Sequence, residues 1–114
     1  MSILSTAALA GTSLATAIKG DPRFHAILKE IGSLHDRKQA DYGTDADPFA
    51  NYRSSEEIGI PAWQNAFMRS MEKTNRVKSF IRNGRLANEG VEDAFMDLAT
   101  CAIIALLEYR EVSK

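Results

Sequence analysis

Residues 89–107 read EGVEDAFMDLATCAIIALL. Three acids stand four residues apart at the start of this stretch, at Glu89, Asp93 and Asp97, and an apolar run follows. At about 100° of rotation per residue, the acids share one narrow stripe of a helix, which continues through Thr100, Ile104 and Leu107. Because the later run is apolar on every side, its positions must be buried. We therefore expect the acids to face the protein interior.

Carboxylates that are clustered and turned inward need a cationic partner. Without one, desolvation and mutual repulsion disfavour their charged forms. A divalent metal ion is the leading candidate for that partner.

Composition sets the frame for this interpretation. The chain has 114 residues, of which 45% are hydrophobic and 25% are charged, so we expect one globular domain with a modest core. A net charge of −1 predicts no general attraction to nucleic acid or to an anionic membrane. The single cysteine, Cys101, excludes a disulfide framework and predicts a buried, inert thiol in a reducing cytoplasm.

The first twenty residues differ from the rest. They are rich in Ala, Ser and Thr and carry no acid or base before Lys19. Ala8-Leu9-Ala10 imitates a signal-peptidase site, but there is no basic segment before it, and polar residues interrupt the apolar run. The segment is also too short and polar to span a bilayer. We expect residues 1–20 to form an arm, either loosely ordered or packed on a neighbouring subunit, and residues 21–114 to form the domain.

Helical periodicity dominates the remainder, and the predicted fold class is all-α. Asp21-Pro22 predicts the start of a helix that reaches about Ala40. A second helix is expected from Pro61 to near Asn83, with Gly84 as its stop. A third, capped by Asn88, is expected to run to about Glu111. The connection between the first two is rich in Gly, Asp and Ser and predicts a loop with one helical turn at residues 54–58. The architecture expected is a bundle of three long helices with short helical pieces, completed by oligomerisation.

The second helix has two contrasting faces. Its apolar side is expected to carry Trp63, Phe67, Thr74, Val77 and Ile81, and its polar side Asn65, Arg69, Glu72, Arg76 and Ser79. The polar side is either a solvated face with an ordinary Glu72–Arg76 pair, or it faces the acidic stripe across a wet cleft. In the second case Glu72 completes a metal site, while Arg69, Lys73 or Arg76 meets negative charge on a ligand.

Polar residues also end the apolar line of the first helix. By the same helical step the line reaches Lys38 and then Asp41-Tyr42. One interpretation places a ligand phosphate on Lys38 and a base or sugar against Asp41 and Tyr42. The other is that this helix end leaves the core and is solvated.

Taken in order, four motifs resemble a known family: Lys38-x-x-Asp41-Tyr42-Gly43, Asp47-Pro48-Phe49-Ala50-Asn51, Glu72-Lys73-x-x-Arg76 and Glu89-x-x-x-Asp93-x-x-x-Asp97. Together they resemble the phage and prophage nucleotide modification associated domain, which is similar to the MazG-like all-α NTP pyrophosphohydrolases. The resemblance covers roughly residues 24 to 110. It implies a helical bundle, usually a dimer or tetramer, in which carboxylates from two helices hold magnesium and a nucleoside triphosphate is cut to a monophosphate and pyrophosphate.

The resemblance also implies roles for individual residues. The implied metal ligands for Mg²⁺, with Mn²⁺ as a substitute, are Glu72, Glu89, Asp93 and Asp97. Glu89 or Glu92 is expected to accept the proton of the attacking water. The implied substrate-binding residues are Lys38, Asp41, Tyr42, Asn51, Arg69, Lys73 and Arg76.

The acidic pattern departs from that of the better-known enzymes. Those carry Glu-x-x-Glu followed by Glu-x-x-Asp, whereas here Asn75 stands three residues after Glu72, and Glu89 precedes Asp93 by four. The reduced set is compatible with a different metal geometry, or with a protein that binds nucleotide without cutting it. A helical adaptor with no ligand is a third possibility.

Association with a second copy follows from the last helix. One of its faces carries Val91, Phe95, Leu98, Ala102 and Leu106, and Ile103, Ile104 and Leu107 need cover as well. Three helices do not easily wrap all of these side chains. We therefore expect a homodimer or homotetramer with ligand sites near the interface, in the cytoplasm of a cell or of a phage host.

Overall fold

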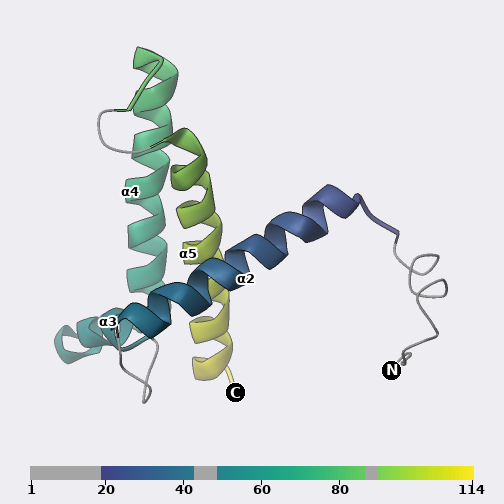
Figure 1. The fold of residues 1–114 in the computed structure, drawn as a ribbon. Helices are drawn as coiled ribbons and strands as arrows, with labels where there is room; N and C mark the ends of the chain where they lie inside the picture. Colours follow the sequence, from purple (N-terminus) through teal and green to yellow (C-terminus); the bar gives the residue numbers. More distant parts are fainter. Residues whose placement is uncertain (1–18, 43–48, 87–89) are drawn as a thin grey trace, which may run out of the picture. The chain divides into compact units, whose positions relative to one another are not determined.

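The computed structural model describes residues 19–42, 49–86 and 90–114, and every element in these ranges is a helix (Figure 1). The all-α prediction is confirmed for them. The elements are α2 (Pro22–Tyr42), α3 (Ala50–Arg53), the 3-10 helix η1 (Ser54–Ile58), α4 (Ala62–Asn83) and α5 (Val91–Val112).

The chain forms two compact units, Met1–Asp36 and Arg37–Lys114, whose boundary lies within α2. In the first unit, Asp21 caps α2 as expected, because its Oδ1 accepts the backbone N–H of Arg23 at 2.8 Å. Pro22 is the first helical residue. Most of the expected arm, residues 1–18, lies outside the described residues.

Helix α4 has the predicted ends, whereas α5 begins later than predicted, because its N-cap is Gly90 and not Asn88. Pro61 precedes α4, and Gly84 ends it with a left-handed φ of 75° while its N–H donates to the Phe80 carbonyl at 2.7 Å. Glycine adopts this conformation without the steric cost of a Cβ. Helix α5 begins at Val91 after an extended Gly90. The expected cap Asn88 falls in residues 87–89, outside the described ranges.

The connection before α4 contains more helix than expected. The predicted turn at Ser54–Ile58 is confirmed as η1, and α3 adds a turn in front of it. Gly59, with φ 83°, ends η1. The Ser55 hydroxyl lies 2.8 Å from the Ile60 carbonyl and 3.1 Å from the Tyr52 carbonyl, so it ties the end of this segment to its beginning. The segment is therefore a compact folded piece.

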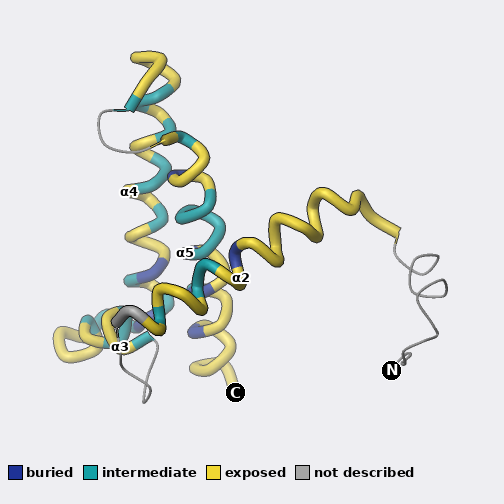
Figure 2. The backbone as a smooth tube through the Cα atoms, viewed as in Figure 1, coloured by how far each residue is buried: buried dark blue, intermediate teal, exposed yellow. Residues whose placement is uncertain are grey.

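Helices α4 and α5 lie side by side and supply most of the core (Figures 1 and 2). The buried residues of these helices are Ala62 and Ala66 on α4, and Ala94, Cys101, Ile104 and Glu108 on α5. Small alanine side chains allow two helix backbones to approach closely. The second unit is therefore built on this helix pair.

The apolar side predicted for α4 is wrong in part. Phe67 and Ile81 are exposed, whereas the packed side runs through Ala62, Ala66 and the half-buried Lys73. These three positions recur at helical spacing, so they form a face of their own. The face of α4 that is turned to α5 carries small residues and Lys73, which forms an ion pair with Asp97 of α5. It does not carry the largest apolar side chains of α4.

No helix in the described ranges is long and apolar enough to cross a membrane.

The close approach of the two helices predicts that Ala66 does not tolerate enlargement. Because Ala66 is fully buried, A66L should lower the free energy of unfolding by about 1–3 kcal/mol through overpacking. The exposed Ala26 of α2 offers the matched control, and A26L should change stability little. Urea denaturation of both variants measures the difference, and equal midpoints would contradict the packing described.

Candidate functional site

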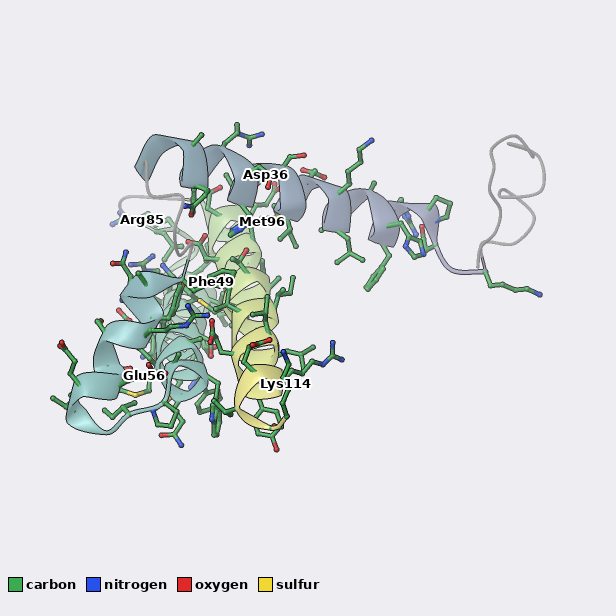
Figure 3. All side chains as sticks on the ribbon, turned by 90° about the horizontal axis from the view of Figure 1, so that it is seen from below. Asp36, Phe49, Glu56, Arg85, Met96 and Lys114 are labelled. Atoms are coloured by element: carbon green, nitrogen blue, oxygen red, sulfur yellow. The ribbon has the colours of Figure 1, made fainter. Side chains whose placement is uncertain are left out.

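Asp97, one of the three acids of the stripe, forms ion pairs with lysines of two other helices. Lys38 of α2 places its Nζ 3.7 Å from Asp97 Oδ1, and Lys73 of α4 places its Nζ 3.4 Å from Asp97 Oδ2. The exposed fractions of the side chains are 21% for Lys73, 24% for Asp97 and 53% for Lys38. Figure 3 draws the side chains of the described residues on the ribbon. Within the second unit, Asp97 thus joins the end of α2 to α4 and α5.

Among the described residues, two ammonium groups share the one Asp97 carboxylate, so these three groups together carry one positive charge. Lys73 and Asp97 are largely removed from solvent, so their interaction is screened less than that of a surface pair. Such a site favours an additional anion.

The other acids expected in the site lie in different surroundings. Glu72, Glu92 and Asp93 are exposed, and Glu89 lies outside the described residues. The expected inward orientation thus holds for Asp97, whereas Asp93 is exposed. In residues 19–42, 49–86 and 90–114 no group of three or more Asp, Glu, His or Cys side chains is arranged to hold a metal ion. In the structure, the charged partners of Asp97 are Lys38 and Lys73.

The expected cationic residues of α4 follow one another along the helix. Arg69 and Arg76 lie one turn before and one turn after Lys73, and both are exposed. Asn51 is exposed on α3, and Asp41 and Tyr42 belong to the last turn of α2. The structure thus brings Lys38, Lys73 and Asp97 together and leaves Arg69 and Arg76 on the same helix as Lys73.

Tyr52 is a site residue that sequence reasoning missed. The Arg69 guanidinium carbon lies 4.8 Å from the centre of the Tyr52 ring, which is a cation–π contact. The pKa of Tyr52 is raised, chiefly by burial, while the charge of Arg69 opposes the shift and that of Asp97 adds to it. The phenol is therefore neutral near pH 7. An aromatic residue in a largely polar connection is the signal that would have pointed to it.

Several charged groups of this region act on Cys101. It is buried, and burial is the main cause of its raised pKa. Lys73 and Arg69 act to lower that pKa, whereas Asp97 and Glu72 act to raise it. Four charged groups thus act on one thiol of α5. The thiol stays protonated at neutral pH, in agreement with the predicted inert role.

A second ion pair fixes the segment that carries Tyr52. Arg53 Nη2 lies 2.9 Å from Glu108 Oε2, and Arg53 Nε lies 3.4 Å from Glu108 Oε1. The Glu108 side chain is 4% exposed and that of Arg53 is 37% exposed. Sequence reasoning missed this pair too, although Glu108 continues the buried helical line of Cys101 and Ile104. The pair attaches α3 to α5.

No protein-family profile, curated protein or solved structure matches this chain.

The buried carboxylate makes the Arg53–Glu108 pair sensitive to loss of the arginine. R53M should lower the free energy of unfolding by about 2 kcal/mol, because it leaves the buried Glu108 carboxylate without its arginine partner. The loss is moderate because the Arg53 side chain is itself partly exposed to water. R110M changes an exposed arginine on α5 and should alter stability little. Thermal and urea denaturation report the difference. An R53M variant as stable as R110M would show that the pair does not hold α3.

Proposed function

We propose that this chain binds a nucleoside triphosphate by its phosphates and, with Mg²⁺, cuts it to a nucleoside monophosphate and pyrophosphate. The observation that carries the proposal is the Lys38–Asp97–Lys73 cluster, because three residues of the motifs named above converge there from separate helices.

Phosphate binding follows from the charge of the cluster. Lysine ammonium groups are compact donors suited to phosphate oxygens. In the absence of a ligand, Asp97 neutralises part of their charge and holds both amines in place. A triphosphate offers more negative charge than one carboxylate, so the amines turn from Asp97 to the phosphates. Asp97 is then released for another cation.

The chemistry of the available acids fits magnesium. Asp97, Asp93 and Glu72 offer only oxygen donors, which Mg²⁺ prefers, and they would hold the ion together with Glu89. When bound, Mg²⁺ would shield the phosphates and stabilise the leaving pyrophosphate. Mn²⁺ would be the substitute metal. Among the protein groups, Glu89 or Glu92 would accept the proton of the attacking water.

The remaining expected residues have supporting roles in this proposal. Lys73, Arg69 and Arg76 would steady negative charge on the phosphates. Asp41, Tyr42 and Asn51 would contact the base or sugar. The setting we propose is control of a nucleotide pool in the cytoplasm, that of the host for a phage-encoded protein.

Release of pyrophosphate tests the catalytic proposal. Purified protein with Mg²⁺ and a panel of deoxynucleoside triphosphates should release pyrophosphate, and D97N should lower kcat/KM by about 100-fold because it removes a metal ligand. D36N removes an exposed carboxylate outside the site and serves as the control. Undiminished turnover in D97N would contradict the assignment of Asp97.

One observation favours a second candidate function, nucleotide binding without turnover. Asp97 is already paired with two lysines, and a metal ion must compete with them. A protein that sequesters nucleotide needs the lysines but not the metal. Tight binding of a triphosphate with no pyrophosphate released would identify this function.

We also propose that a second copy of the chain covers α5. The exposed fractions of Phe95, Ile103 and Leu106 are 52%, 44% and 50%, although these residues are large and apolar. They recur along one side of α5, as expected for a helix that packs on a neighbour. A homodimer or homotetramer would remove this surface from water.

Introducing charge on this side of α5 tests the assembly. F95D/L106D should convert the oligomer to a monomer, because a buried carboxylate without a partner opposes association. I58D places the same charge on an exposed apolar residue of η1 and should leave the assembly intact. Size-exclusion chromatography with light scattering gives the masses. A monomeric wild-type protein at micromolar concentration would contradict the proposal.

A further inference from the structure

Arg69 contacts the Tyr52 ring. Its guanidinium carbon lies 4.8 Å from the ring centre, and no carboxylate among the described residues pairs with Arg69. A guanidinium has five N–H donors, and a pair of them matches two oxygens of a phosphate. Within the described ranges, Arg69 therefore has an aromatic partner and no acidic one.

The position of Arg69 places it beside the lysine cluster. Arg69 and Lys73 are four residues apart on α4, so their side chains leave the same face of the helix. Both act on the Cys101 thiol, together with Asp97. A phosphate chain that begins at Lys38 and Lys73 therefore meets Arg69 one helical turn nearer the start of α4.

Tyr52 is fixed by contacts on both sides. Its carbonyl accepts the Asn65 Nδ2 at 3.0 Å, which ties it to α4. The next residue, Arg53, is bound to the buried Glu108 of α5. The ring consequently has a defined place, which a residue of a loose loop would lack.

We propose that Tyr52 is a positioning residue, which holds Arg69 over the site so that its guanidinium binds a terminal phosphate of a polyphosphate chain. The inference rests on the phosphate binding in the proposed function and adds a residue to which no role was given. Tyr52 acts through its ring, and Arg69 makes the contact with the ligand.

Binding of inorganic tripolyphosphate, measured by calorimetry in EDTA, tests the inference without turnover. Y52L should weaken binding about tenfold, since the guanidinium loses its support, whereas Y52F keeps the ring and should lose less affinity than Y52L. Y109L removes a ring that contacts only Trp63 in the described part of the chain and is the matched control. A Y52L affinity equal to that of the wild type would overturn the inference.

A double-mutant cycle separates positioning from a general structural role. R69Q should weaken binding at least as much as Y52L, and Y52L/R69Q should be no weaker than R69Q alone, because the ring has nothing left to hold. Losses that multiply in the double variant would overturn the inference. R69K changes only an exposed side chain, so it tests the inference even if Y52L fails to fold. Lysine keeps the positive charge but lacks the planar guanidinium, so R69K should weaken binding several-fold. Wild-type affinity in R69K would also overturn the inference.

The outcome is distinct from that of the catalytic proposal. Coupled losses at Tyr52 and Arg69, with no pyrophosphate released from any triphosphate, would support the phosphate subsite and reject catalysis. Pyrophosphate release together with unchanged tripolyphosphate binding in Y52L would support catalysis and reject the positioning role of Tyr52. A wild-type protein that binds no tripolyphosphate would overturn the inference and the phosphate binding on which it rests.

Discussion

The second unit of this protein depends on the pairing of Asp97 with two lysines. Asp97 is a partly buried carboxylate of α5, and partial burial of its charge is tolerated because Lys38 and Lys73 approach it from α2 and α4. The same contacts set which side of α4 is turned to α5. Because the partly buried Asp97 carboxylate needs positive partners, two lysines lie close together beside it. Neighbouring lysines are also suited to bind a phosphate group.

A second ion pair, between Arg53 and the buried Glu108, attaches another part of the unit to α5. Glu108 holds Arg53, which fixes α3 and the tyrosine next to it, and that tyrosine holds Arg69. The two ion pairs lie on the same face of α5, at positions related by helical spacing. Helix α5 therefore uses carboxylates within an apolar surface to attach the end of α2, α3 and α4.

Much of the fold was predictable because its signals are local. Asp21-Pro22, Gly84 and the turn before Gly59 act through the backbone of a few neighbouring residues, and each appears where expected. The inward turn of Asp97 was also predictable, since its stripe leads to the buried Ile104. Its pairing with Lys38 and Lys73 was not, because these two lysines are distant from Asp97 in sequence. Tyr52 and Glu108 were missed because their importance comes from tertiary contacts, which helical periodicity on one element does not contain.

The central claim is that the Asp97 cluster exchanges its internal charge for that of a phosphate ligand. A crystal structure with Mg²⁺ and a non-hydrolysable deoxynucleoside triphosphate tests it most directly. The account predicts Lys38 and Lys73 within about 3 Å of phosphate oxygens, with Asp97 turned to the metal. Lysines that stay on Asp97 while the nucleotide binds elsewhere would contradict it.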